Sequence, residues 1–211
     1  MTVNWRWDAQ TEKALNGAGG ELRKNIVPKM QIGIRKLRTA SPQQRRRWFG
    51  SQEGSVGSKL NVILAFTDRL DVDKSINFIK LQGRNLYGSV WPTVLTPGLG
   101  RRSVLTVGSS VEIRLQDSYF TSDVTEKVNT VFHELTHKLL DTDDALGYSP
   151  PDLLAVAAKD AAGALAALNS AENWTQFFAE VNAAGRGGGG SAGGSSASRP
   201  SPRMALQRCG G

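Results

Sequence analysis

The chain has 211 residues, enough for one ordinary domain with a buried core and a tail. Hydrophobic residues make up 39% of it and charged residues 21%, a balance that is typical of globular proteins and excludes a largely disordered chain. The net charge of +7 suggests a polyanionic partner, and the single cysteine, Cys209, excludes an intramolecular disulfide framework.

The charge is distributed unevenly along the sequence. Residues 1–115 contain 19 Lys and Arg side chains against 8 Asp and Glu, whereas residues 116–184 contain 3 against 11. The positive net charge therefore conceals an acidic segment, and it does not by itself argue for nucleic acid.

The sequence has no segment that suggests a secretory signal or a membrane span. Its start, MTVNWRWD, lacks the basic and apolar regions of a signal peptide, and the longer apolar runs are too short or contain charges. We therefore expect no membrane insertion and a protein that is cytoplasmic as synthesised, with export by a dedicated secretion system as an alternative fate.

The first part of the chain predicts helices. Apolar spacing favours a helix over 11–37, interrupted around 17–20 and at Pro28. A short helix is expected after Ser41, where Pro42 would occupy the first position, and a further helix over 57–72.

Residues 74–116 change in character. Their β-branched runs are separated by glycine and proline, which indicates a small sheet. The expected strands cover residues 79–81, 103–107 and 111–115.

The last part of the chain is expected to be helical and then flexible. A helix over 122–141 has apolar residues at helical spacing and a candidate capping box at its start, and two more helices are expected over 151–169 and 170–184. Residues 185–211 are rich in Gly, Ser and Pro, so we expect a flexible tail there.

The sequence HELTH lies on the helix expected over 122–141, and it contains both histidines of the chain, His133 and His137. Side chains four residues apart lie on the same face of a helix, so both imidazoles can reach one metal ion. Glu134 projects beside them, where a carboxylate can act as general base and acid. The pattern indicates one catalytic Zn²⁺, although two histidines and a glutamate can also be ordinary surface or core residues.

A catalytic zinc site needs a third protein ligand. With no further histidine in the chain, the candidates are the carboxylates just beyond the helix, Asp141, Asp143 and Asp144.

The segment HELTHKLLDTDDALGY resembles the zinc-binding motif of the deuterolysin and peptidyl-Lys metalloendopeptidase (aspzincin) family. In that family a Gly-Thr-x-Asp-x-x-Tyr segment follows HExxH and its Asp is the third ligand, so the resemblance implies that Asp144 binds zinc. The family's Gly is Asp141 here, and its Tyr falls on Gly147, one residue before Tyr148. The resemblance therefore implies, with this displacement, that Tyr148 stabilises the oxyanion.

Three weaker similarities surround this motif in the order that the family has. They are Arg47-Trp48-Phe49-Gly50, Val111 to Phe120, and the run from Ser170 to Phe177. The resemblance covers roughly 40–182 and implies an α+β, mainly helical zincin-like metallopeptidase domain over 1–184, with a small sheet beside the HExxH helix. With its single cysteine, the chain is similar to a cysteine-poor bacterial branch of the family, whose members include toxins and effectors with delivery or immunity partners.

Lysine-specific members of the family place acidic side chains where the substrate's Lys enters. The matching positions here are Glu172 and Thr175, so one carboxylate is kept and the other is missing. The resemblance implies a protein or peptide substrate and a preference for Lys after the scissile bond. The alternative is that Glu172 simply begins the last helix.

Two further features have alternative interpretations. Arg45 to Arg47 with Trp48 and Phe49 would suit a nucleic-acid surface, but a solvated basic helix face with buried aromatic residues is favoured. Arg208-Cys209-Gly210 resembles the cysteine switch of matrix metalloproteinases, but an incidental cysteine in the tail is favoured.

The sequence thus predicts a zinc metalloendopeptidase and no nucleic-acid partner. The alternatives are a non-catalytic zinc-binding module of the same fold and, in a different class, a basic nucleic-acid-binding protein.

Overall fold

The computed structural model describes residues 21–68, 76–81, 88–90, 111–147 and 149–184, and all structural statements concern these ranges. The flexible tail expected over 185–211, the strand expected over 103–107 and the side chain of Tyr148 lie outside the described residues.

The described chain begins with helices that surround the HExxH helix. A π-helical turn, η1 (Leu22–Ile26), leads into α2 (Val27–Lys36), and the 3₁₀ turn η2 (Leu37–Thr39) follows. The next elements are α3 (Pro42–Phe49), η3 (Gly50–Gln52) and α4 (Glu53–Asp68). The interruption expected at Pro28 is therefore a change from π- to α-helical hydrogen bonding, with the proline in the first turn of α2, where its missing N–H costs little.

The later helices follow three short strands. These strands are β1 (Ile76–Leu81), β2 (Gly88–Val90) and β3 (Val111–Gln116), in the order β1-β3-β2. β1 runs parallel to β3 with Phe78 opposite Ile113, and β2 runs antiparallel to β3 with Gly88 opposite Leu115. The following helices are α5 (Asp117–Thr121), α6 (Val124–Leu140), α7 (Pro150–Lys159), α8 (Ala161–Leu168) and α9 (Ala171–Ala184).

The expected α+β fold class is wrong in the weight that it gives to a small sheet, whereas the expectation of a mainly helical fold is confirmed for the described part of the chain. The strands contain six, three and six residues, and they form no layer comparable with the helices. A small sheet is therefore not a defining part of the class. The physical reason is that β-branched residues favour extended backbone only weakly, so a few such runs do not make a sheet a main layer of the fold.

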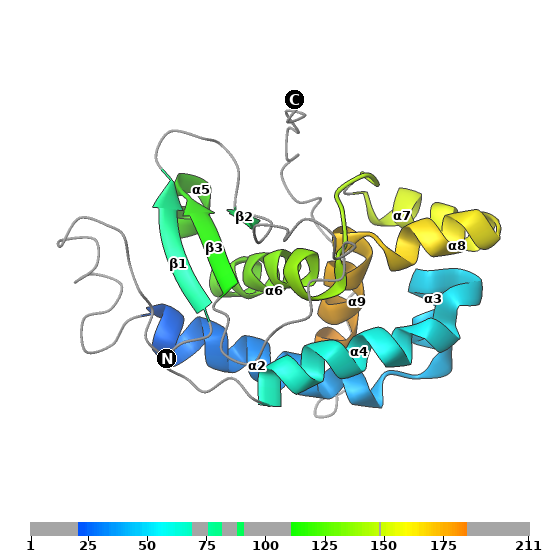
Figure 1. The fold of residues 1–211 in the computed structure, drawn as a ribbon, viewed down its shortest axis with the longest axis horizontal. Coiled ribbons are helices and arrows are strands. Elements are labelled where there is room, and N and C mark those ends of the chain that lie inside the picture. The colour runs from blue at the N-terminus through cyan, green and yellow to red at the C-terminus, as the bar shows by residue number, and fades with distance from the viewer. Residues whose placement is uncertain (1–20, 69–75, 82–87, 91–110, 148, 185–211) are drawn as a thin grey trace, which may run out of the picture.

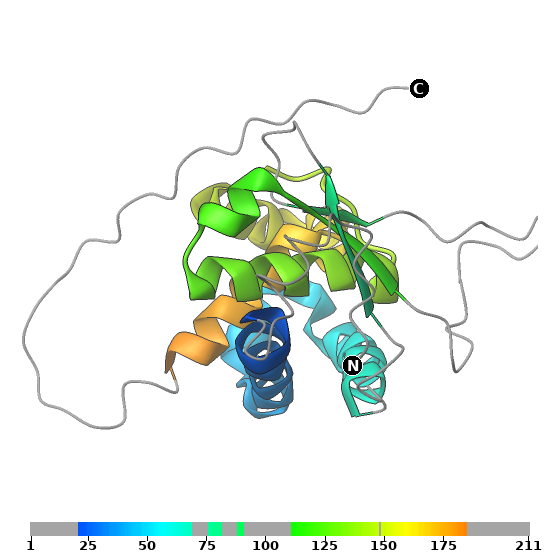
Figure 2. The ribbon, with the colours of Figure 1, turned by 90° about the vertical axis from the view of Figure 1, so that its left-hand side faces the viewer.

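Helix α6 lies at the centre of the molecule and carries the HExxH sequence. It contacts α2, α4 and α9, and Figures 1 and 2 show α2 and α4 beneath it when α6 is horizontal. The start of α6 is fixed by Asp123, whose side chain accepts a hydrogen bond from the N–H of Glu126 at 2.9 Å. Its buried residues recur at helical spacing, as the sequence predicts, and include Val128, Val131, Phe132, Leu135 and Leu139.

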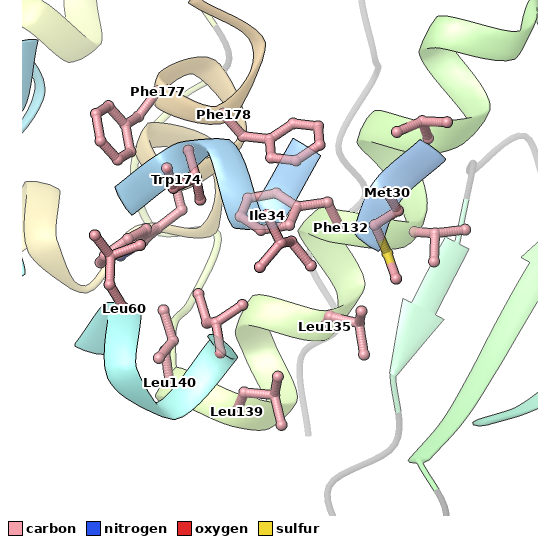
Figure 3. Packing of buried hydrophobic residues seen from close by; sticks show 14 of the residues in the cluster. Met30, Ile34, Leu60, Phe132, Leu135, Leu139, Leu140, Trp174, Phe177 and Phe178 are labelled. Carbon is pink, nitrogen blue, oxygen red and sulfur yellow. The ribbon is translucent and has the colours of Figure 1, made fainter. Parts of the chain in front are cut away.

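Aromatic side chains join α6 and α3 to α9. The rings of Phe132 and Phe178 stack with centroids 4.2 Å apart, and Phe49 lies 4.7 Å from the ring of Trp174. Figure 3 shows Phe132 and Phe178 facing each other above Ile34 of α2. The core thus holds α9 against the face of α6 that also contributes His133.

The single helix expected over 151–169 is also wrong, because two helices occupy that stretch. The backbone of Asp160 is extended, with φ −165° and ψ −177°, which ends α7. The side chain of Asp160 then accepts a hydrogen bond from the N–H of Gly163 at 2.7 Å and begins α8. An alanine-rich apolar run conceals this break, because its composition favours helix on both sides.

None of the described helices is both long enough and apolar enough to cross a membrane.

Candidate metal centre

Helix α6 presents its two histidines one turn apart on the same face. Their rings meet edge to face with centroids 4.8 Å apart, and the two Nε2 atoms are separated by 3.2 Å. Both side chains are largely buried, with 13% of His133 and 18% of His137 exposed. The i, i+4 spacing therefore converges as the sequence predicts.

The chain turns sharply after α6 and brings Asp144 back to the histidines. Asp141 ends the helix in the left-handed region, with φ 54° and ψ 44°. Oδ1 of Asp144 then lies 3.1 Å from Nε2 of His133 and 3.3 Å from Nε2 of His137. Of the three carboxylates that the sequence left as candidates for the third ligand, Asp144 is the one that joins both histidines in a group able to hold a metal ion.

The turn that carries Asp144 is held by the start of α9. The N–H of Asp143 donates to the carbonyl of Asn169 at 2.8 Å, and the N–H of Ala171 donates to the carbonyl of Asp143 at 3.0 Å. These two bonds form a parallel bridge between Asp143 and Ser170. Backbone pairing far along the chain thus fixes the position of the third candidate ligand.

The histidine Nδ1 atoms show which nitrogen of each ring faces the site. Nδ1 of His137 lies 2.8 Å from the carbonyl oxygen of Thr142, which can only accept, so this Nδ1 carries hydrogen. Nδ1 of His133 lies 3.2 Å from Oγ1 of Thr175, whose own hydrogen is donated to the carbonyl of Ala171 at 2.9 Å. In the neutral rings, both Nε2 lone pairs therefore point toward each other and toward the Asp144 carboxylate.

Three converging electron pairs form a group that could hold a metal ion between them. A tetrahedral zinc with bonds of about 2.0–2.1 Å to nitrogen and oxygen would separate its ligand atoms by about 3.3–3.4 Å. The three separations in the structure are 3.1, 3.2 and 3.3 Å. Two imidazole nitrogens and one carboxylate oxygen are also a donor set that catalytic zinc uses, so the residues present fit this metal.

In the metal-free chain, the pKa values of His133, His137 and Asp144 are shifted in the directions that favour positive charge on the histidines and negative charge on the carboxylate. Burial opposes protonation of His133, but hydrogen bonds to Asp144 and Glu172 outweigh it and raise the pKa to about 10. Burial similarly opposes protonation of His137, and Asp144 raises its pKa. Burial disfavours ionisation of Asp144, yet hydrogen bonds from the two histidines hold the pKa of this carboxyl far below its usual range. A metal ion would therefore displace protons from the site.

Glu134 is a buried carboxyl beside this group. Only 4% of the residue is exposed, and its Oε2 has no hydrogen-bond partner among the described residues. Burial raises the pKa of Glu134 to about 7, although the neighbouring His133 and His137 partly oppose the shift. A carboxyl with this pKa can both accept and release a proton near neutral pH.

The remaining predicted site residues lie in different places. Tyr148, the predicted oxyanion donor, is outside the described residues, whereas Gly147 is exposed with open space around it. Glu172 and Thr175, predicted to bind substrate, are buried on α9 and lie next to Nδ1 of His133.

Sequence reasoning missed two residues that support the site. Thr142 accepts from His137 through its carbonyl, and its hydroxyl lies 3.0 Å from that of Thr136. Lys59 on α4 donates to the carbonyl of Leu140 at 3.0 Å and to Oδ1 of Asn169 at 3.2 Å. Thr142 matches the Thr of the family's segment, but a contact made by its backbone carbonyl leaves no signal in residue type. Lys59 lies more than seventy positions before the motif, so neither supporting contact was predicted.

Two further sequence features are the basic segment that contains Trp48 and Phe49, and Cys209. Trp48 and Phe49 are buried, and Arg46 and Arg47 form ion pairs with Glu53 and Glu180 at 3.5 and 3.1 Å. The aromatic part of the considered nucleic-acid surface is therefore in the core. Cys209 lies outside the described residues.

Comparison with known proteins leaves the resemblance to the aspzincin family as an interpretation of the motifs. No protein-family model matches the chain, and no curated protein matches it.

Proposed function

We propose that this protein is a zinc-dependent metalloendopeptidase that hydrolyses peptide bonds in proteins. One observation carries the proposal: the Nε2 atoms of His133 and His137 and a carboxylate oxygen of Asp144 converge at separations of 3.1 to 3.3 Å beside a buried carboxyl. A structural zinc site usually has four protein ligands, whereas a catalytic site has three and leaves the fourth position open, which the group found among the described residues matches. The neighbouring Glu134 carboxyl has an Oε2 without a hydrogen-bond partner in the part of the chain that the structure describes.

The chain's own residues divide the work of peptide hydrolysis. His133, His137 and Asp144 would hold the metal, and a bound Zn²⁺ supplies Lewis acidity that activates water and polarises a carbonyl. Glu134 takes a proton from the attacking water and passes it to the nitrogen of the leaving amine, a role that its pKa of about 7 suits. The side chain of Asp144 is 37% exposed, which leaves one side of the group open to a substrate.

Several finer parts of the proposal rest on the aspzincin resemblance. They include an oxyanion role for Tyr148 and service as an exported toxin or effector with a delivery or immunity partner. The resemblance also implies a Lys preference after the scissile bond, but the contacts of Glu172 and Thr175 with Nδ1 of His133 favour a different role for these two residues. A non-catalytic zinc-binding module is the second candidate function. The observation that favours it is that the family's Tyr position is occupied by Gly147, which has nothing within 4 Å of its would-be Cβ.

Zinc stoichiometry and casein cleavage by the full chain test the proposal. We expect one zinc per chain, lost in His133→Ala, and cleavage that falls by at least about a hundredfold in Glu134→Gln with the zinc retained. Glu126→Gln is the matched control, because Glu126 is a partly buried glutamate two turns earlier on α6. Stoichiometric zinc with equal cleavage by the wild type and Glu134→Gln would refute the catalytic assignment, and zinc without any cleavage would favour the second candidate.

A further inference from the structure

Helix α9 places two polar side chains behind the metal-facing side of His133. Nδ1 of His133 lies 3.2 Å from Oγ1 of Thr175 and 3.5 Å from Oε2 of Glu172. Each of these two residues is only 7% exposed, and they lie within one turn of each other on α9. The imidazole therefore has its Nε2 toward the candidate metal and its Nδ1 toward α9.

The hydrogen bonds around this contact leave only acceptors facing His133. Thr175 donates its hydroxyl hydrogen to the carbonyl of Ala171, so a lone pair of Oγ1 remains for the imidazole. The other oxygen of Glu172, Oε1, accepts from Nε2 of Gln176 at 2.7 Å, which holds the carboxylate in place. This arrangement selects the ring form of His133 that has hydrogen on Nδ1 and a free lone pair on Nε2.

We propose that Glu172 and Thr175 are positioning residues that orient His133 and strengthen it as a zinc ligand, rather than residues that bind the substrate's side chain. The inference rests on the metal site of the proposed function. A carboxylate or hydroxyl behind a ligating histidine fixes the ring and raises its basicity, and loss of such a partner costs about 10- to 100-fold in metal affinity.

This assignment changes what the site selects in a substrate. A carboxylate that contacts His133 and Gln176 and is 9% exposed is poorly placed to bind a Lys ammonium from a peptide. The enzyme is then expected to cleave peptides with Lys or Leu after the scissile bond with similar efficiency. An acidic residue at this position of the sequence is thus explained by the metal site alone.

The test uses the full chain and four variants. Glu172→Gln removes the charge but keeps the shape, Thr175→Val removes the hydroxyl, and Thr175→Ser restores it. Glu180→Gln is the control, because Glu180 is on the same helix but bonds Trp48 and Arg47. Zinc affinity is measured by competition with a chromophoric chelator, and ¹⁵N NMR reports which nitrogen of His133 carries hydrogen.

We expect zinc affinity to fall about 10- to 100-fold in Glu172→Gln and Thr175→Val, and to be close to wild type in Thr175→Ser and Glu180→Gln. At saturating zinc, any loss of cleavage should be equal for Lys and Leu peptides. The NMR spectrum of the zinc-loaded wild type should show hydrogen on Nδ1 of His133, and the chemical shift of this nitrogen should change in Thr175→Val, which loses the hydroxyl acceptor.

Unchanged zinc affinity in both Glu172→Gln and Thr175→Val would overturn the inference, as would a loss in Glu172→Gln that is confined to Lys peptides. If Glu172→Gln is destabilised, comparison of Thr175→Val with Thr175→Ser still measures the effect of the Thr175 hydroxyl on zinc affinity. Zinc binding without peptide cleavage would refute the proposed function alone, because the affinity comparison needs no activity. A wild type that binds no zinc would refute both.

Discussion

Lys59 is predicted to stabilise both the fold and the candidate metal site. Its ammonium group joins three elements, because it extends from α4 to the carbonyl of Leu140 at the end of α6 and to Oδ1 of Asn169, just after α8. Asn169 in turn accepts the backbone N–H of Asp143, next to Asp144. The variant Lys59→Met keeps the aliphatic stem of the side chain and removes both hydrogen bonds.

The expected effect follows from these two bonds. A hydrogen bond to a charged group contributes about 1.5–3 kcal/mol to stability, but Lys59 is partly exposed and burial lowers the pKa of its ammonium. Water can replace part of what is lost, so we expect the free energy of unfolding to fall by about 1.5–3 kcal/mol in total rather than twice that amount. For a chain of this size this corresponds to a fall in Tm of about 3–12 °C.

Thermal unfolding and zinc affinity of the metal-free and zinc-loaded chains check this prediction. The control is Lys29→Met, which changes an exposed lysine on α2. Zinc affinity should fall several-fold in Lys59→Met, because the turn that carries Asp144 loses one of its anchors. A Tm within 1 °C of the wild type would show that the carbonyl of Leu140 is equally well solvated without Lys59, and the reasoning would be refuted.

Three further predictions concern packing, protons and a helix cap. A Cβ at Gly33 would lie 2.5 Å from Cζ of Phe178, so Gly33→Ala should lower the free energy of unfolding, measured in urea, by about 1–3 kcal/mol. A Cβ at Gly57 would meet open space, so Gly57→Ala should raise the free energy of unfolding by about 0.5–1 kcal/mol. Because the pKa of His133 is raised to about 10, zinc binding at pH 8 should release at least one proton, which calorimetry in buffers of different ionisation enthalpy measures; zero release would contradict the assigned pKa. By the same shift, the contribution of His133 to the stability of the metal-free chain is fully present below pH 6.5 and is lost as the pH rises through about 10. Asp160→Ala should cost about 1 kcal/mol by thermal unfolding, because α8 loses its N-cap; an unchanged Tm would show that the cap is dispensable.

The residues of the candidate site that are close in sequence could be predicted, because helical spacing is a reliable geometric rule. His133 and His137 face one point since they are one turn apart, and the cap at Asp123 and the apolar repeat after it predicted the helix that holds them. Among the three carboxylates beyond that helix, spacing alone did not choose. The choice of Asp144 came from a resemblance, and in the structure it depends on the left-handed backbone of Asp141.

The parts that could not be predicted depend on contacts between distant segments. The resemblance implies that Glu172 and Thr175 bind substrate, because a motif gives the place of a residue in the sequence and not its contacts. Their contact with Nδ1 of His133 arises from the packing of α9 on α6, which is made by side chains such as Phe132 and Phe178. The α+β class was wrong for a related reason, since local β-propensity does not determine how large a sheet is in the folded protein.

The arrangement explains why a ligand set contained within twelve residues needs most of the described domain. The helix alone would place His133 and His137, but Asp144 follows a turn whose backbone is bonded to Asn169 and Ala171. The same stretch of chain, where α9 begins, also presents Thr175 to the back of His133. Because α9 supports two of the three candidate ligands, a displacement of α9 would loosen both together. The candidate metal centre is therefore best understood as a product of the packing of α9 on α6, to which the stacked rings of Phe132 and Phe178 contribute.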